Sequence, residues 1–286
     1  MSLSSIQLEA FSAVTQTLNF TKAAGMLHIT QSALSQRILN LESELGTTLF
    51  IRDKSGIKLT EEAQELIKYC QFKNQCEDEF VSKLKSKDAK QIAGTLRVGG
   101  FSSVMRSIFL PAVSDLLSKN PLLKLQMLIR EVYELFDLLK RSEIDFIIIN
   151  SNIEREDIES VFLGYEENVL VQKKNYSGEK VYLDHDESDE VTFNYLKKFA
   201  RKSKKIKRCY LDDTYGILEA VKLGLGYAVL PKHLIENEKN IEVINPQQIL
   251  KIPVYLCFYR QPYYTKMHLS LVEKVVSAFK EILPTF

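Results

Sequence analysis

The apolar residues of the first sixty positions recur at helical spacing and predict three short helices in succession. The first helix would end at the polar break of residues 17–19, and Thr21 is placed to cap a second helix over residues 22–27. Thr30, at the end of the following turn, would cap the third helix. Gly46 comes directly after the last apolar residue of that helix, where left-handed backbone is needed.

The third of these helices has an unusual polar face. Its apolar stripe, which must be buried, consists of Leu34, Ile38, Leu41 and Leu45. The opposite face holds uncharged residues that are weak helix formers but can donate and accept hydrogen bonds: Ser32, Ser35, Gln36 and Ser43. A helix that only faces water rarely carries such a surface.

Two short extended pieces follow in the segment LFIRDKSGIKLT, residues 49–60. Gly56 stands where a hairpin turn needs positive φ, so we expect a two-stranded wing. Thr60 would then cap a long helix that begins with two glutamates, the charge that a helix N-terminus favours. Apolar residues recur along it at spacings of three and four, interrupted by Lys73, and predict a coiled-coil seam of Leu66, Tyr69, Cys76 and Phe80. The alternative is a lone helix packed on its own domain.

From residue 95 strands alternate with helices, which predicts an α/β fold with parallel sheets. Strands are expected first at TLRVG, LKLQMLI and IDFIIIN, with helices at residues 104–117 and 132–139. After SVFLGYEENVLVQ the alternation of strands and helices begins again. Strands are expected at KVYLD, IKRCYLD, GYAVLP and VYLCFY, and helices at residues 191–200, 217–222 and 266–282. Two such units in tandem would leave a crevice between them.

A polar, charge-rich stretch over residues 83–93 separates the two patterns, so we place a domain boundary before Gly94. The expected domains are residues 1–60, a linker helix over residues 61–93 and an α/β domain over residues 94–286. The length of 286 residues and the hydrophobic content of 45% suit two globular domains.

Charge is balanced over the whole chain, with 38 basic and 37 acidic residues, so any nucleic-acid contact has to come from a local patch. The basic run of residues 197–208 follows an acidic segment and is expected to be a solvated face, with a second nucleic-acid surface as the alternative. The four cysteines show no zinc-site spacing and no disulfide framework, which agrees with a reducing compartment. With no basic leader and no run of about 18 apolar residues, we expect a cytoplasmic protein without membrane contact.

The motif FTKAAGMLHITQSALSQRILNLESELGTTLF at residues 20–50, the wing and the helix that begins at Thr60 resemble the winged helix-turn-helix and linker helix of LysR-type transcriptional regulators. Residues 94–286 are similar to the effector-binding domain of that family in element order and in GTLRVG, FLP and GLGYAVLP. The resemblance implies an all-α winged helix-turn-helix followed by two α/β subdomains of the periplasmic-binding-protein type. VYLDHDESDEVTFNYL resembles the regulators of this family that respond to basic amino acids.

The resemblance also implies that the third helix enters the major groove of DNA, and its polar face agrees with this role. Gln31 can pair bidentately with adenine, while Ser32 and Ser35 suit base edges or phosphates. Arg37 would clamp a phosphate, and Arg52 has the reach and charge for the minor groove. The expected DNA contacts are Thr30, Gln31, Ser32, Ser35, Gln36, Arg37, Arg52, Lys54 and Lys58. The alternative is that these are ordinary solvated residues.

One copy of this domain should bind DNA weakly, because residues 1–60 hold only five basic and four acidic side chains. Copies joined through the linker helix would recover affinity through effective concentration. We therefore expect a dimer that binds an interrupted palindrome, and the resemblance implies that dimers join into a tetramer.

Small molecules bind open α/β sheets at the strand-to-helix loops. Ser102 and Ser103 begin a helix whose backbone N–H groups suit a ligand carboxylate, and Glu131, Asp184 and Asp212 suit an amino group or basic tail. The expected effector site comprises Phe101, Ser102, Ser103, Glu131, Asn150, Asn152, Asp184 and Asp212, and the expected effector is an amino acid such as lysine or arginine. Each acid has the alternative of capping a helix or facing water.

Other functions remain open alternatives. An enzyme is the first, but the four histidines lack metal-ligand spacing and the chain has no Gly-rich phosphate loop or G-x-S-x-G motif. We therefore expect no catalytic residue, no metal and no cofactor. Only His185, between two aspartates, could matter chemically, and a sensor pocket explains it equally well. The second alternative is a DNA-binding regulator without a ligand, in which the α/β half serves only assembly.

Overall fold

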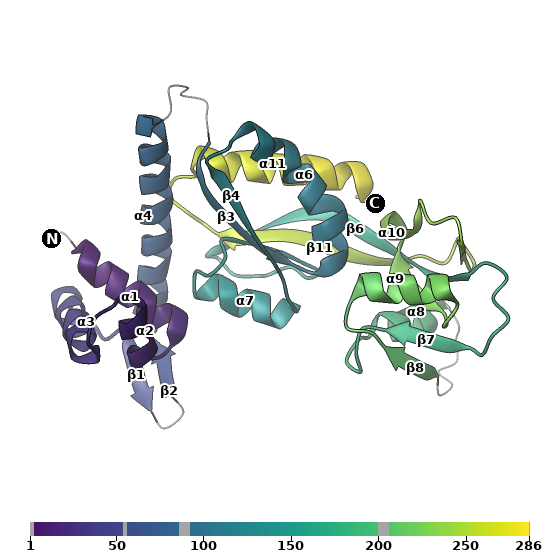
Figure 1. The fold of residues 1–286 in the computed structure, drawn as a ribbon, viewed down its shortest axis with the longest axis horizontal. Coiled ribbons are helices and arrows are strands. Elements are labelled where there is room, and N and C mark those ends of the chain that lie inside the picture. The colour runs from purple at the N-terminus through teal and green to yellow at the C-terminus, as the bar shows by residue number, and fades with distance from the viewer. Residues whose placement is uncertain (1–2, 54–55, 86–91, 200–205, 286) are drawn as a thin grey trace.

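The computed structural model describes residues 3–53, 56–85, 92–199 and 206–285 (Figure 1). The N-terminal part consists of three helices, a hairpin and one long helix: α1 (Ser5–Thr17), α2 (Phe20–Met26), α3 (Gln31–Leu45), β1 (Phe50–Asp53), β2 (Gly56–Leu59) and α4 (Glu61–Lys85). The three short helices and the hairpin gather around the first half of α4, and the second half of α4 extends beyond them (Figure 1). The expected helices and wing are therefore confirmed.

Local sequence signals set most of these boundaries. The Thr30 side chain accepts a hydrogen bond from the Ala33 amide at 3.2 Å, and Gly46 adopts a φ of 68° at the end of α3. Thr60 caps α4 by accepting from the Ala63 amide at 3.1 Å. The expectation that Thr21 caps the second helix is wrong: Asn19 caps α2 by accepting from the Lys22 amide at 2.9 Å. The helix starts earlier because Phe20 is needed in the core.

The core of this domain is aromatic at its centre. Phe50 of β1 lies with its ring centroid 5.6 Å from that of Phe11 and 5.9 Å from that of Phe20, so the wing is anchored to α1 and α2. Leu34, Ile38 and Leu41 of α3 are buried in the same core, as their spacing predicts. Leu66 is also buried there, at 8% exposure, so it packs within its own domain instead of lining a coiled-coil seam.

The α/β half contains one large mixed sheet and one small parallel sheet. The large sheet has the order β10-β6-β11-β5-β3-β4, and β9 also pairs with β6. Its strands are β3 (Gly94–Gly100), β4 (Leu123–Ile129), β5 (Phe146–Ile149), β6 (Ile158–Lys173), β9 (Ala228–Pro231), β10 (Ile241–Val243) and β11 (Leu250–Tyr259), and the small sheet pairs β7 (Val181–Asp184) with β8 (Lys207–Tyr210).

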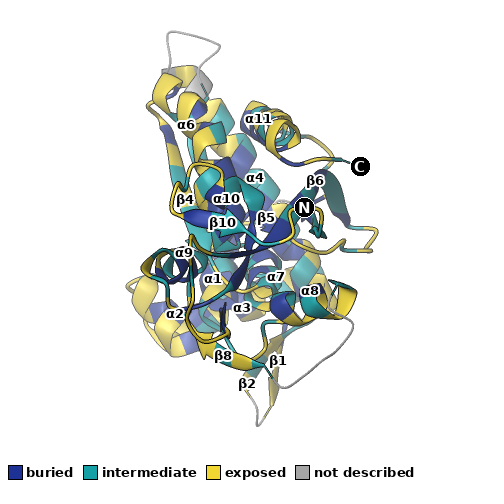
Figure 2. Cartoon of the chain, turned by 90° about the vertical axis from the view of Figure 1, so that its right-hand side faces the viewer, coloured by how far each residue is buried: buried dark blue, intermediate teal, exposed yellow. Residues whose placement is uncertain are grey.

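Helices cover these sheets. Ser102 begins a continuous helical stretch made of α5 (Ser102–Val104), the π-helical segment η1 (Met105–Phe109) and α6 (Leu110–Lys119). The remaining helices are α7 (Val132–Lys140), α8 (Val191–Phe199), α9 (Thr214–Leu223), α10 (Lys232–Ile235) and α11 (Lys266–Ile282). In the first subdomain α6 and α11 cover one face of the sheet and α7 covers the other (Figure 1). Figure 2 shows the resulting buried strands, in dark blue, beneath partly exposed helices.

The expectation of two tandem units with parallel sheets is only partly right. Strands β3, β4 and β5 pair in parallel, and so do β7 and β8, but β6 and β11 run antiparallel to each other along ten paired positions. These two long strands connect the subdomains, and β11 and α11 return the chain to the first one (Figure 1). The pattern of apolar residues does not predict strand β6, because two polar residues, Glu166 and Asn168, occupy buried positions on it.

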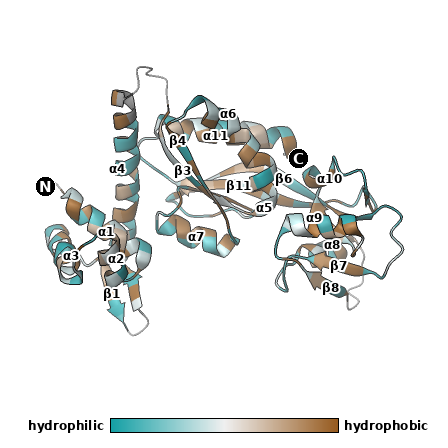
Figure 3. Ribbon diagram, viewed as in Figure 1, coloured by the Kyte–Doolittle hydropathy of each residue, from teal (hydrophilic) through white to brown (hydrophobic). Residues whose placement is uncertain are grey.

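The apolar residues lie mainly where the sheet is covered, as the brown segments of β3, β4 and β11 in Figure 3 show. Within the described ranges, no helix has the length and apolar character that crossing a membrane requires.

Candidate functional site

The exposed face of α3 is an ordered row of polar side chains. Gln31 donates from Nε2 to Ser35 Oγ at 3.1 Å, and Gln36 donates from Nε2 to Asn40 Oδ1 at 2.8 Å. Thr30 and Ser32 share a hydrogen bond of 3.0 Å between their hydroxyls. Gln31, Ser32 and Gln36 are exposed, whereas Ser35 and Arg37 are half-buried. With Thr30, which is also exposed, the six residues expected to contact DNA from this helix lie on or beside one accessible surface. Asn40, which the sequence analysis did not include, extends this row.

The wing contributes a second polar element beside α3. The guanidinium carbon of Arg52 lies 3.9 Å from the ring centroid of Phe20, and this contact orients the arginine toward the groove between the wing and α3. Glu42 ties the wing to α3 by accepting from the Leu49 amide at 2.7 Å. Lys58 is paired with Asp53 at 2.7 Å, and Lys54 lies outside the described residues.

A second site lies in the α/β half, where a cavity of about 470 Å³ opens between the two subdomains. We call it the acidic cavity because six carboxylates share it with one guanidinium and one imidazole. It is lined by Phe101, Ser102, Ile129, Arg130, Glu131, Glu134, His185, Asp186, Ser188, Asp189, Asp212, Asp213 and Thr214. These residues follow β3, β4, β7 and β8, which are the strand ends where such folds bind ligands.

The structure brings four of the eight expected effector residues together: Phe101, Ser102, Glu131 and Asp212. The expectation that Asp184 contacts the effector is wrong, because its buried carboxylate is held by the Arg208 guanidinium and the Thr192 hydroxyl. Ser103 is buried and donates to Glu166 Oε1 at 2.7 Å, so it does not line the cavity. Asn150 and Asn152 are exposed on the loop after β5, also outside the lining.

His185 is the central side chain of the acidic cavity. Its Nε2 lies 3.9 Å from Glu131 Oε1 of the first subdomain and 3.6 Å from Asp212 Oδ1 of the second. Its Nδ1 lies 3.3 Å from Asp186 Oδ2. Hydrogen bonds from the Ser188 hydroxyl and from His185 hold the pKa of Asp186 at about 2, so this carboxylate stays ionised. Carboxylates from both subdomains thus lie around this imidazole, and a cation bound beside it would meet both of them.

The carboxylates of the acidic cavity differ in the hydrogen bonds that they already accept from other groups of the protein. Asp213 caps α9 by accepting from the Gly216 amide at 3.2 Å, and Asp189 accepts from the His185 and Val191 amides at 3.1 and 2.8 Å. Glu131 and Asp212 are more accessible, with side chains 52% and 96% exposed. These two are therefore the carboxylates best placed to bind a ligand.

A buried polar network behind the acidic cavity links the two subdomains. Glu166 of β6 accepts from Ser103, and its Oε1 lies 3.0 Å from His233 Nε2 of α10. His233 Nδ1 lies in turn 3.0 Å from the Ser107 hydroxyl. Nearer the cavity, Ser102 donates to the Thr214 hydroxyl at 3.1 Å. The sequence could not reveal this network, because each of these hydrogen bonds joins residues more than sixty positions apart along the chain.

None of the described residues forms a group of three or more His, Cys, Asp or Glu arranged to hold a metal ion. The carboxylates of the acidic cavity are separated by the imidazole and by their own hydrogen bonds.

Comparison with known proteins finds two family models that match successive parts of the chain. Residues 6–64 match the family described as bacterial regulatory helix-turn-helix protein, lysR family, and residues 89–280 match the LysR substrate binding domain. A carbapenem-hydrolyzing beta-lactamase transcriptional activator of Enterobacter cloacae is 29% identical over 246 residues, covering 82% of this chain and 80% of that protein. YcgK of Bacillus subtilis, an uncharacterized regulator that is 28% identical, is matched over 51% of its own length and 58% of this chain.

Two solved structures share the fold over nearly the whole chain. ArgP from Mycobacterium tuberculosis has a TM-score of 0.79 at 20% identity and covers 100% of both chains. Full-length LysG from Corynebacterium glutamicum with its effector Arg bound has a TM-score of 0.76 at 19% identity, covering 99% of this chain and 100% of that one. The similarity extends from the helix-turn-helix through the linker helix to both α/β subdomains.

Proposed function

Because this chain belongs to the LysR family of transcriptional regulators, we propose that it senses a basic amino acid in the acidic cavity and reads DNA with α3 and the wing. As a member of this family, the protein is a sequence-specific DNA-binding regulator, and a small-molecule effector modulates its activity. It acts as a homo-oligomer. The identity of the effector and the residues that contact it are the parts that we propose.

The observation that carries the proposed effector class is the charge of the acidic cavity. Its six carboxylates exceed its one guanidinium and one imidazole, so an ammonium or guanidinium group would gain Coulomb energy there while an anion would lose it. Glu131 and Asp212 face this position from opposite subdomains. A planar guanidinium offers parallel N–H donors that suit two carboxylates, which favours arginine among the basic amino acids.

The other end of the ligand would lie at the first helix of the cavity. Ser102 begins the helical stretch of residues 102–119, whose first backbone N–H groups and positive dipole end suit an α-carboxylate. The cavity volume of about 470 Å³ falls in the range of small-molecule sites. LysG, whose structure holds Arg as effector, supports the same ligand class by its shared fold.

Isothermal titration calorimetry on the full chain tests this proposal, with arginine, lysine, ornithine and glutamate as ligands. We expect binding of at least one basic amino acid, and we expect Glu131→Gln and Asp212→Asn each to weaken it about tenfold or more, as loss of a charged hydrogen bond does. Asp115→Asn on α6 is the matched control, because its carboxylate pairs with Lys119 and does not line the cavity. Binding of glutamate alone, or an affinity for basic amino acids that neither cavity variant changes from the wild-type value, would refute the assignment.

Two further elements complete the proposed function. Paired copies of the helix-turn-helix would read an interrupted palindrome, since the two-fold symmetry of a dimer is matched by that of such a site. The protein would act in the cytoplasm, where its DNA target is found. Its relatives are transcriptional regulators, and we propose that binding without catalysis is the whole of its chemistry.

A further inference from the structure

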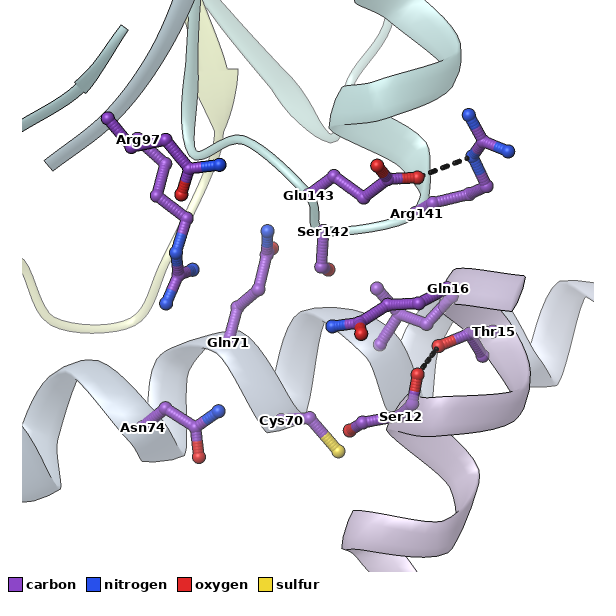
Figure 4. Close-up of a pocket in the computed structure, with 12 residues that line it drawn as sticks. Ser12, Thr15, Gln16, Cys70, Gln71, Asn74, Arg97, Arg141, Ser142 and Glu143 are labelled. Atoms are coloured by element: carbon purple, nitrogen blue, oxygen red, sulfur yellow. Dashed lines mark hydrogen bonds and ion pairs between the residues drawn. The ribbon is translucent and has the colours of Figure 1, made fainter. Parts of the chain in front are cut away.

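A second polar cavity, of about 320 Å³, lies between the DNA-binding domain and the α/β half (Figure 4). We call it the interdomain cavity. Helices α1 and α4 form one wall, and β3, β4 and the turn after α7 form the other. Its lining residues are mostly hydroxyl, amide and guanidinium side chains, including Gln16, Gln71, Asn74, Arg97, Gln126 and Ser142. It shares no residue with the acidic cavity.

Three buried polar atoms of the residues that line this cavity have no hydrogen-bond partner among the described residues. Gln71 of α4 is 6% exposed, and its Nε2 is one of them. The others are Ser142 Oγ in the turn after α7 and Arg141 Nε, which forms an ion pair with Glu143 Oε1 at 3.2 Å. Figure 4 shows the Gln71 amide in the space between the Arg97 guanidinium and Ser142. Because a buried donor without a partner costs about 1–3 kcal/mol, these atoms indicate a guest that accepts hydrogen bonds.

The charge of the interdomain cavity is opposite to that of the acidic cavity. Its ionised side chains are Arg97, Arg141 and Glu143, which leave an excess of one positive charge. Arg141 Nε lies 3.2 Å from Glu143 Oε1, so these two compensate each other. Arg97 Nη1 makes only a long contact of 3.5 Å with Asp145 Oδ1, which leaves most of its N–H groups for another acceptor.

We propose that the interdomain cavity binds a small organic carboxylate, whose oxygens accept from Arg97, Gln71 and Ser142. Carboxylate oxygens provide about four lone-pair sites and no donor, which matches three converging donors better than an alcohol or an amide does. A guanidinium also pairs more strongly with a carboxylate than with a neutral acceptor. This site is a second ligand site, distinct in place and charge from the one that the proposed function uses.

A ligand in this position would act on the arrangement of the two domains. The cavity lies between two direct contacts of α4 with the α/β half: Lys68 Nζ is 2.8 Å from Asp157 Oδ2, and Gln75 donates to Asp145 Oδ1 at 3.4 Å. A carboxylate held by Gln71 on one wall and Arg97 on the other binds only while these walls face each other. By mass action it therefore stabilises this arrangement over any in which α4 moves away.

Calorimetry on the full chain with succinate, citrate, pyruvate and inorganic phosphate tests the proposal. We expect at least one carboxylate to bind, Gln71→Leu and Arg97→Gln each to weaken that binding at least tenfold, and Gln64→Leu to leave it unchanged. Gln64→Leu is the matched control, since it makes the same replacement two turns earlier on α4 at a residue that does not line the cavity. Gln71→Leu keeps the test decisive should Arg97→Gln fail to fold.

The acidic cavity supplies the second comparison. Glu131→Gln should leave the affinity for the carboxylate unchanged, and Gln71→Leu should leave the affinity for arginine unchanged, so failure of one site does not decide the other. The proposal would be overturned by any of three results: binding of phosphate alone, no binding of any of the three carboxylates, or a carboxylate affinity in the Gln71→Leu variant equal to that of the wild type. In the last two cases ordered water would be what satisfies Gln71 and Ser142.

Discussion

The polar side chains at the start of α3 are hydrogen-bonded to one another before DNA arrives. Gln31 is held by Ser35, which fixes its amide near the exposed N-terminal end of the helix. A side chain fixed in this way loses less rotamer freedom on binding, so its bidentate contact with a base should be strong. At the scale of single residues, Gln31 is therefore the best-supported base reader.

Gln31→Ala should cost about 1–3 kcal/mol at one base position and relax the preference there. Competition binding with duplexes selected from random sequence, each changed at one position, measures this. Lys58→Ala is the comparison: it should weaken all duplexes alike and only slightly, because Asp53 already pairs with Lys58 at an exposed site. An unchanged rank order of duplexes in the Gln31 variant would show that another side chain reads the base.

Asp145 couples stability to pH. Burial raises its pKa from 3.8 to about 6, despite the nearby Arg97. The folded chain therefore holds a proton there that the unfolded chain has lost, so the free energy of unfolding should fall as pH rises from about 4 to about 6. Asp145→Asn should remove this component and raise stability at neutral pH. Urea unfolding at a series of pH values checks it, and a parallel decline in the variant would contradict the account.

Single residues also show where sequence reasoning succeeds and fails. Thr30, Gly46 and Thr60 were predictable because capping depends on neighbours three residues away. The misplaced Asp184 needed knowledge of Arg208, which strand pairing brings beside it from 24 positions away. His185 was noticed between its aspartates, but Glu131 and Asp212 meet it only through the fold.

At the scale of elements, α4 has two different halves. Its first half is part of the DNA-binding domain, where Leu66, Ile67 and Cys70 are buried. Tyr69 is exposed on the same half, and in the second half Phe80 and Leu84 are exposed, at 61% and 71%. Large apolar side chains left exposed on a helix indicate a surface that another copy covers. The expected pairing surface thus remains a prediction for Tyr69, Cys76 and Phe80, without Leu66.

Phe80→Glu should shift the protein toward smaller assemblies, because it places a charge in the apolar contact between paired helices. Light scattering at micromolar concentration measures the mass of the wild type and the variant. Tyr133→Glu on α7 provides the control, since it replaces another exposed aromatic residue, 74% exposed, on a different helix. A wild-type monomer, or equal effects of both replacements, would contradict pairing through α4.

Element order in the α/β half was largely predictable, whereas strand pairing was not. Apolar patterns located β3, β4 and β5, and β5 reads as a continuous apolar run because it is buried along its whole length. It missed β6, whose buried Glu166 belongs to the polar network behind the acidic cavity. The buried polar residues of that network break the apolar pattern, so the sheet that joins the subdomains could not be derived from periodicity.

At the scale of the whole molecule, the acidic cavity and the DNA-reading face lie in different domains. The two α/β subdomains are joined by β6 and β11, and the ligand that we propose to bridge Glu131 and Asp212 would change the angle between them. The α/β half in turn contacts α4 through Lys68 and Asp157, 2.8 Å apart, so such a change reaches the helix that carries the DNA-binding domain. A ligand acts in this way only if it binds one arrangement better than the other.

The affinity for arginine, measured by calorimetry with and without saturating duplex DNA selected by the protein, tests this coupling most directly. If both ligands bias the same arrangement of domains, DNA must change the affinity for arginine by the same factor by which arginine changes the affinity for DNA. We expect a change of about fivefold or more, the lower end of typical allosteric coupling. Identical affinities for arginine in the two measurements would contradict the account.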